Sequence, residues 1–290
     1  MTGILLIDKP EGWTSSDVVA KLRGILREKR IGHAGTLDPL ATGLLVVLVG
    51  RATRAASFAE AQEKEYLARL RPGCVTDTQD ITGTRIGGEE RLVTEDELLA
   101  VLPAFCGEIE QVPPMYSAIK VKGQKLYEIA RRGGEIERAP RRITVSELRL
   151  TGRDGDDFLL TLRCSKGTYV RTLCHDIGRR LGCGACMSAL RRTRSGSFSL
   201  DGACTIEQVQ RAAEQGTAER LLLPVDRLFE DCPALTLTAA QEKKLRCGNP
   251  VPLRQAAEGR CRAYGPDGSF LALCRAQGGE LLTIKSFFEV

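Results

Sequence analysis

The chain has 290 residues, 42% of them hydrophobic, and a formal net charge of +5. This length accommodates one large domain or two unequal domains, and the apolar fraction is sufficient for a sizeable core. No apolar run approaches the length of a membrane span, and Asp8 and Lys9 follow the first apolar run too closely for a signal peptide, so we expect a cytoplasmic protein without a membrane partner.

Strands and helices alternate through the first 232 residues. Apolar spacing, capping residues and turn residues together define the segments. Pairs of strands with intervening helices favour an α+β fold with a mixed, largely antiparallel sheet flanked by helices. The predicted strands are 3–8, a central strand at 44–49, 64–70, 117–121, 143–150, 158–162 and 188–198. The predicted helices are one that starts at the N-cap residues Ser15, Ser16 and Asp17, and those at 54–62, 94–102, 126–132, 168–181 and 206–213. A turn is predicted at 122–123.

The pattern changes near residues 224–233. Beyond this stretch, one short helix at 239–246 and several short strands separated by glycine-rich turns predict a small β-rich appendage. It is too short to hold much core alone, so we expect it to pack on the main body. The expected domains are therefore 1–232 and 233–290.

Eleven cysteines are scattered along the chain, which does not fit a disulfide framework. Cys183 and Cys186 form one C-x-x-C pair, and Cys174 and His175 lie a few residues upstream. A metal site built from these residues is one interpretation, but no second pair follows at zinc-finger spacing. Reduced and mostly buried thiols are the preferred interpretation, and we expect no metal.

Basic residues gather in two parts of the sequence. Such clusters are typical of proteins that contact phosphates, and the alternative is a solvated surface with interspersed acids. The clusters are Arg131, Arg132, Arg138, Arg141 and Arg142, and Arg179, Arg180, Arg191, Arg192 and Arg194.

One loop motif, GHAGTLDPLATG at 32–43, lies between a predicted helix and the central strand. Pro39 disfavours the α region for Asp38, and Gly35 and Gly43 permit backbone angles closed to other residues. Aspartate-proline pairs with glycines usually mark a plain turn. The alternative is a carboxylate that the loop holds facing a cleft.

Four segments together resemble one family. They are GHAGTLDPLATG at 32–43, KEY at 64–66, VPPMYSAIK at 112–120 and KGTYVR at 166–171. Their order and spacing resemble the TruB family of tRNA pseudouridine-55 synthases from residue 3 to about residue 229. The tail resembles, more weakly, the small PUA-type RNA-binding domain of bacterial members. The resemblance implies the pseudouridine synthase fold and the isomerisation of uridine 55 in the T loop of tRNA to pseudouridine.

The resemblance also implies roles for individual residues. Asp38 matches the catalytic aspartate, Arg171 matches the arginine paired with it, and Tyr66 matches the tyrosine stacked on the target base. The implied partner is the T arm of tRNA, with no cofactor, no metal and no obligate protein partner, and we expect a monomer. The other implied substrate-binding residues are Tyr169 and Leu190, in the pocket, and His33, which enters the space vacated by the extruded nucleotide.

The reaction breaks the bond from ribose C1′ to uracil N1 and rejoins the base through C5. Nothing is oxidised, which fits the lack of a dinucleotide or P-loop motif. It needs an ionised carboxylate, which a neighbouring Arg171 favours; the alternative for this arginine is an ordinary phosphate contact. Extruding the base costs a few kcal/mol, and stacking on Tyr66 returns roughly 1–3 kcal/mol. Phosphate contacts are expected from the arginine clusters and from Lys9, Lys120 and Lys122.

Two other functions compete with this one. The first is a non-catalytic RNA-binding or tRNA-folding protein on the same scaffold, and the intact Asp38 argues against it. The second is a glycosidase with a pair of carboxylates, which needs a second acid opposite Asp38. Asp80 is the nearest candidate by motif, but we expect it to support the arginine network.

Overall fold

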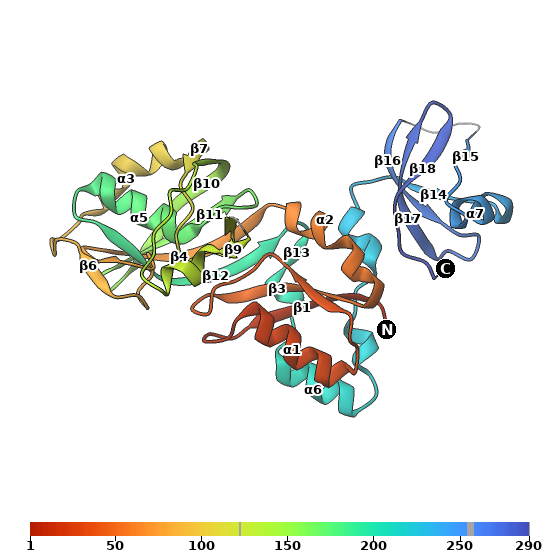
Figure 1. Cartoon of the computed structure of the whole chain (residues 1–290), viewed down its shortest axis with the longest axis horizontal. Coiled ribbons are helices and arrows are strands. Elements are labelled where there is room, and N and C mark those ends of the chain that lie inside the picture. Colours follow the sequence, from red (N-terminus) through yellow and green to blue (C-terminus); the bar gives the residue numbers. More distant parts are fainter. Residues whose placement is uncertain (122, 254–257, 290) are drawn as a thin grey trace.

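The structure is a computed structural model that describes residues 1–121, 123–253 and 258–289. Within these residues, a nine-stranded sheet runs through the larger part of the molecule (Figure 1). The strand order is β1-β3-β12-β4-β11-β10-β7, and the short strands β2 and β13 pair with β3 and β12. The strands are β1 (Gly3–Lys9), β2 (Ile31–Ala34), β3 (Thr42–Val49), β4 (Lys64–Pro72), β7 (Gly107–Gln111), β10 (Arg141–Asp154), β11 (Asp157–Cys164), β12 (Ala185–Ser195) and β13 (Phe198–Ser199).

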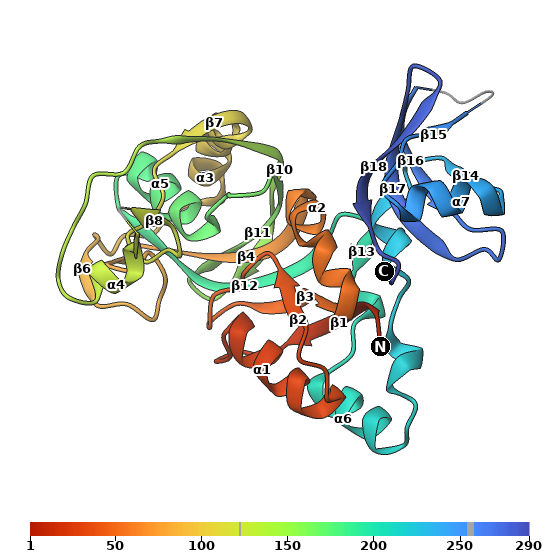
Figure 2. The same cartoon turned by 45° about the vertical axis from the view of Figure 1, so that its right-hand side comes forward.

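The pairing of β3 with β12 is parallel, and the other pairings described in this sheet are antiparallel. The predicted mixed, largely antiparallel sheet flanked by helices is therefore confirmed. Helices α1 and α6 cover one side of β1 and β3, and α3 and α5 cover the other half of the sheet (Figure 2). The helices of this part are α1 (Ser15–Leu26), α2 (Ala56–Ala61), α3 (Glu95–Val101), α4 (Leu126–Ala130), α5 (Val170–Leu181) and α6 (Ile206–Glu214).

Short elements fill the connections. Two small hairpins project from the sheet, and the one formed by β5 and β6 bridges to β12 through Asp80 and Met187. The hairpin strands are β5 (Val75–Thr76) with β6 (Arg85–Gly87), and β8 (Lys120–Val121) with β9 (Gln124–Lys125). The 3₁₀ turns are η1 (Gly50–Ala55), η2 (Leu102–Phe105), η3 (Leu200–Gly202), η4 (Ala218–Leu221) and η5 (Val225–Phe229).

Strand β3 is buried on both faces, as its continuous apolar run predicts. Leu44, Val46 and Leu48 face a core shared with Phe198 and Phe229. The alternating set Leu45, Val47 and Val49 packs against α1 and α6. Alternate residues of a strand point to opposite faces, so this packing fixes the register of β3. The loop before β3 therefore ends on a rigid support.

Two local predictions are wrong. Helix α1 is capped by Thr14, whose side chain accepts from the Asp17 N–H while the Asp17 carboxylate accepts from the Thr14 N–H; this reciprocal box leaves Ser15 free to bond elsewhere. The strand expected at 117–121 is shortened to Lys120–Val121, because the Ser117 N–H donates to Met115 O in a turn. The turn expected at 122–123 includes Lys122, which lies outside the described residues.

The tail forms a five-stranded sheet in the order β14-β16-β17-β18-β15, with one helix against it (Figure 1). It has a hydrophobic core of its own, which was not expected from its length. It also packs on the main body, as expected: Phe229 lies 6.2 Å from Phe270 and 6.1 Å from Phe287 between ring centroids. The elements are β14 (Ala234–Thr236), α7 (Ala239–Arg246), β15 (Val251–Pro252), β16 (Gly259–Tyr264), β17 (Phe270–Gln277) and β18 (Glu280–Ser286). In the described part of the chain, no helix combines the length and apolarity that crossing a membrane requires.

Candidate active site

The loop that carries Asp38 runs from the end of β2 to the start of β3. Gly35 has φ +77° and Gly43 has φ +94°, so both positions use the backbone freedom predicted for them. A Cβ at Gly43 would lie 2.3 Å from the backbone oxygen of Arg192. Glycine is therefore required where the loop joins β3 and meets β12.

Two buried side chains hold this loop to the N-terminal segment. The Ser15 hydroxyl donates to Leu37 O at 3.2 Å and accepts from Leu37 N at 2.9 Å. The Lys9 ammonium is fully buried and donates to three backbone carbonyls, including that of Pro39. Burial lowers the pKa of Lys9 to about 8. The phosphate contact expected from Lys9 is therefore wrong, because this side chain braces the loop from inside.

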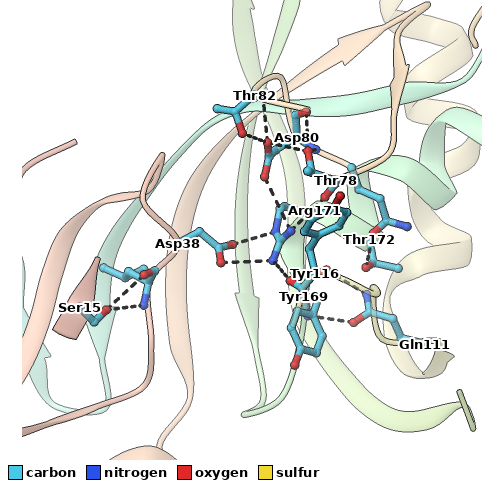
Figure 3. A network of polar contacts seen from close by, with 12 residues as sticks. Ser15, Asp38, Thr78, Asp80, Thr82, Gln111, Tyr116, Tyr169, Arg171 and Thr172 are labelled. Carbon is cyan, nitrogen blue, oxygen red and sulfur yellow. Dashed lines mark hydrogen bonds and ion pairs between the residues drawn. The ribbon is translucent and has the colours of Figure 1, made fainter. Parts of the chain in front are cut away.

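The structure brings Asp38 and Arg171 together (Figure 3). Arg171 Nε lies 2.8 Å from Asp38 Oδ2, and Nη2 donates to Oδ1 at 3.2 Å. The Arg171 side chain is 5% exposed, whereas that of Asp38 is 35% exposed. The arginine is thus fixed inside the protein, and it presents a carboxylate that a substrate can reach.

Arg171 is held from several sides. Its guanidinium donates to Thr78 O at 3.0 Å and to Tyr116 O at 2.9 Å, and Asp80 Oδ2 lies 3.7 Å from Nη1. The other Asp80 oxygen accepts hydrogen bonds from Thr78 and from the backbone and hydroxyl of Thr82 (Figure 3). Asp80 is 7% exposed and contacts the far side of the guanidinium. Asp80 therefore supports the arginine, as expected. It does not form, with Asp38, the open pair of carboxylates that a glycosidase needs.

Opposing effects act on the ionisation of Asp38. Burial raises the pKa of its carboxyl, the Arg171 guanidinium lowers it and the Asp80 carboxylate raises it, with a net shift upward. The arginine does favour the ionised form, as expected, but desolvation outweighs it. Asp38 therefore takes up a proton at a higher pH than an ordinary aspartate.

Tyr66 and Leu190 lie in the hydrophobic core beside the loop, in the cluster that includes Leu37. They are 8% and 7% exposed, so little of either surface is open in this state. Both project from neighbouring strands, because Leu190 pairs with Ala68 and Arg192 pairs with Tyr66. Burial raises the pKa of the Tyr66 phenol, which keeps this group protonated.

Tyr169 and His33 occupy different surroundings. Tyr169 is the N-cap residue of α5, and the Gln111 amide bonds its N–H at 2.8 Å and its C=O at 3.1 Å. Its half-buried phenol has a pKa raised by burial, with Asp38 and Arg171 among the neighbouring charges. His33 lies on β2 opposite Val47. Among the described residues, no hydrogen bond or ion pair connects His33 to the Asp38–Arg171 pair.

Several supporting residues were not predicted. Gln111, Thr78 and Tyr116 hold Arg171 or the backbone two residues before it. Two of them act through backbone carbonyls, which carry no sequence signal. The available signal was the position of Gln111 directly before the VPPMYSAIK segment, because the strand that it ends, GEIEQ, has only one apolar side chain.

The arginine clusters lie mostly on the surface, with one exception. Arg131, Arg132, Arg141 and Arg142 are exposed, whereas Arg192 is 1% exposed. A phosphate contact from Arg192 is therefore wrong, because its guanidinium is enclosed in the core. The cysteines are free thiols, and those at 174, 183 and 186 are buried. No group of three metal-ligating side chains occurs in the described residues.

Solved structures share this fold along almost the whole chain. A structure described as an H/ACA RNP bound to a substrate RNA containing 2′-deoxyuridine has a TM-score of 0.76 and 25% identity, covering 99% of this chain and 85% of that one. A Cbf5-Nop10-Gar1 complex gives a TM-score of 0.75 and 27% identity, covering 99% and 85% of the two chains. Residues 23–170 match the family described as TruB family pseudouridylate synthase, N terminal domain. Fold and site thus define an enzyme of the pseudouridylate synthase class.

The rest of the chain matches the same group. Residues 171–230 match the tRNA pseudouridylate synthase B C-terminal domain, and residues 232–288 match the tRNA pseudouridine synthase II C-terminal region. The tRNA pseudouridine synthase B of Cupriavidus metallidurans is 43% identical, covering 96% of this chain and 92% of the relative. That of Geobacter sulfurreducens is 45% identical over 95% and 90% of the two chains. The chain belongs to the TruB family.

Proposed function

We propose that this enzyme isomerises uridine 55 in the T loop of tRNA to pseudouridine, with Asp38 as the catalytic carboxylate. One observation carries the proposal: a partly exposed carboxylate, on a loop braced from inside, is paired with an arginine that is itself buried. The relatives named tRNA pseudouridine synthase B support tRNA as the substrate. The motif match at 32–43 supports the role of Asp38.

In this mechanism, Arg171 keeps the Asp38 carboxylate ionised and directed toward the ribose and base. Without this guanidinium, the pKa of the carboxyl would rise further, which disfavours the ionised form that the reaction needs. Asp80 and the carbonyls of Thr78 and Tyr116 hold the guanidinium in place. Such a preorganised site aligns the carboxylate before the glycosidic bond breaks.

The uridine must leave its stack before Asp38 can reach the sugar bond, so the proposal includes base flipping. Tyr66 would stack on the extruded base, and Tyr169 and Leu190 would line its pocket. Because Tyr66 and Leu190 are now nearly covered, the base would insert beside the loop and extend the existing core. His33 would fill the gap left in the RNA. Its half-buried position on β2, the strand that leads into the Asp38 loop, is compatible with this role.

The RNA contacts follow from the charge distribution. The exposed arginines at 131, 132, 141 and 142 follow the segment after Tyr116 in the chain and would contact the phosphates of the T arm. We propose residues 1–232 as the catalytic domain and 233–290 as a PUA-like RNA-binding domain. The T-loop shape, more than base-edge contacts, would select the substrate.

One assay tests this function. The purified protein is incubated with a uridine-labelled T-arm hairpin, without added metal or nucleotide, and the modified position is mapped. We expect one pseudouridine, at the position equivalent to 55, with all of the base retained in the RNA. Free uracil among the products would favour a glycosidase, and unmodified RNA bound tightly would favour an RNA-binding protein.

A further inference from the structure

Arg192, on β12, is a buried charge that the mechanism above does not use. It is 1% exposed and heads the largest fully buried side chains. Buried charges are normally paired with opposite charges. Among the residues that the structure describes, however, no carboxylate forms an ion pair with Arg192; its guanidinium donates to two backbone carbonyls instead.

These acceptors lie at both ends of the catalytic loop. Arg192 Nε donates to Leu44 O at 2.6 Å, and Nη2 donates to Gly35 O at 3.0 Å. Gly35 precedes Asp38 and Leu44 follows it, so one guanidinium closes the base of the loop. A planar guanidinium can bond two acceptors at once in a fixed geometry, which a lysine ammonium cannot do.

The same side chain contacts the residue proposed to stack on the base. The Arg192 side chain lies near the Tyr66 phenol and lowers its pKa, against the larger effect of burial. Arg192 also pairs through its backbone with Gly43 on one neighbouring strand and with Tyr66 on the other. It therefore connects the loop of Asp38 to the strand of Tyr66.

We propose that Arg192 is a positioning residue for pseudouridine formation, fixing the Asp38 loop and the Tyr66 strand in one arrangement. The inference rests on the proposed function. It explains why a charged residue lies in the core without a charged partner: the guanidinium supplies two directed hydrogen bonds to neutral oxygens.

The surroundings favour arginine over lysine at this position. Lys9 and Lys64 lie nearby, and burial, with a further contribution from the Arg192 charge, lowers the pKa of each to about 8. Burial would lower the pKa of a lysine at the same place in the same way, and its ammonium lacks the planar pair of donors that bonds both carbonyls. Arginine keeps its charge and all its donors at any physiological pH.

The test separates chemistry from RNA binding. Arg192→Lys and Arg192→Gln are compared with the unchanged protein by the single-turnover rate at saturating T-arm hairpin and by the Kd for that hairpin. Arg71→Lys is the matched control. Arg71 lies on β4, the strand next to β12, and is paired with the buried Asp157 of β11. Hydrogen exchange across residues 35–44 reports the order of the loop.

We expect both Arg192 variants to lower the rate roughly 10- to 100-fold, with the Kd changed by less than about threefold. Exchange should quicken at 35–44, and Arg71→Lys should change neither quantity. Rates within threefold of the unchanged protein in the Arg192 variants would overturn the inference, as would equal losses in rate and binding. If Arg192→Lys does not fold, Arg192→Gln decides.

Asp38→Asn, assayed in parallel, separates the two proposals. If that variant is inactive and the Arg192 variants are fully active, only the positioning role of Arg192 fails. If Asp38→Asn remains fully active, the proposed function itself fails.

Discussion

At Asp38, burial and the Arg171 guanidinium shift the carboxyl pKa in opposite directions. The reaction requires the ionised form, so the rate should fall as the pH drops through the Asp38 pKa. Arg171→Met removes the contribution that lowers this pKa. We therefore expect the acidic limb of the single-turnover rate to move to higher pH, with a smaller movement in Arg171→Lys. A limb that stays in place or moves to lower pH would contradict the assigned pairing.

Ser15 provides a second test at the residue scale. Ser15→Ala removes both hydrogen bonds to the backbone of Leu37, next to Asp38. We expect a loss of about 1–3 kcal/mol in the free energy of unfolding, because a buried backbone donor and acceptor lose their partner. The single-turnover rate should also fall. Ser16→Ala, at the exposed neighbouring position, is the control and should change neither quantity in urea unfolding and rate measurements.

At the scale of elements, the junction of β3 with β12 depends on a glycine. Gly43→Ala places a Cβ 2.3 Å from Arg192 O at φ +94°, so we expect a destabilisation of roughly 2–5 kcal/mol. Gly12→Ala is the matched control: its φ is +80°, but nothing lies within 4 Å of the added Cβ. There we expect only the backbone strain, about 1–2 kcal/mol. Equal losses in the two variants, measured by urea unfolding, would argue against this close approach.

Strands with a clear pattern of apolar residues could be predicted from the sequence, but the strands with which they pair could not. Strand β3 is buried on both faces and therefore has a continuous apolar run, whereas β4 is buried on one face and therefore alternates between buried and more exposed residues. Both patterns predict a strand. The parallel contact of β3 with β12 joins residues about 150 apart in the sequence. Nothing local encodes such a pairing, so the environment of Arg192 could not be inferred.

In the active site, too, the residues in motifs could be predicted, but the groups that hold them in place could not. The Asp38 loop and Arg171 carry motifs, but the carbonyls of Thr78 and Tyr116 that hold the arginine are backbone groups common to every residue. The exposed Ser16 and the buried Ser15 are the same residue type in adjacent positions, and only the fold distinguishes them. Lys9 and Arg192 were predicted to contact phosphate, because charged side chains are usually exposed.

At the scale of the whole molecule, an aromatic cluster joins the tail to the main body. Phe287 is 5% exposed and packs on Phe229 from η5 and on Phe270 from β17. We expect Phe287→Ala to weaken this contact by about 3–5 kcal/mol and to separate unfolding into two transitions in calorimetry. The Kd for full-length tRNA should rise, whereas the single-turnover rate at saturation should stay the same.

Phe288→Ala is the control for that experiment. Phe288 packs on the core of the tail and lies against Arg246, so its loss destabilises the tail without removing the joint cluster. Only the stability of the tail should then fall, and the transition of the main body should stay the same. If Phe287→Ala lowers the saturated rate as strongly as it weakens binding, the tail contributes to the chemical step and the assigned division of labour is wrong.

The most direct measurement compares the unchanged protein with Asp38→Asn on a T-arm hairpin under single-turnover conditions, with the Kd determined separately. The amide keeps the size of the side chain but cannot supply an anionic oxygen. We expect no detectable pseudouridine from Asp38→Asn and a Kd within a few-fold of the unchanged protein. Pseudouridine formed at an undiminished rate would contradict the central role of Asp38.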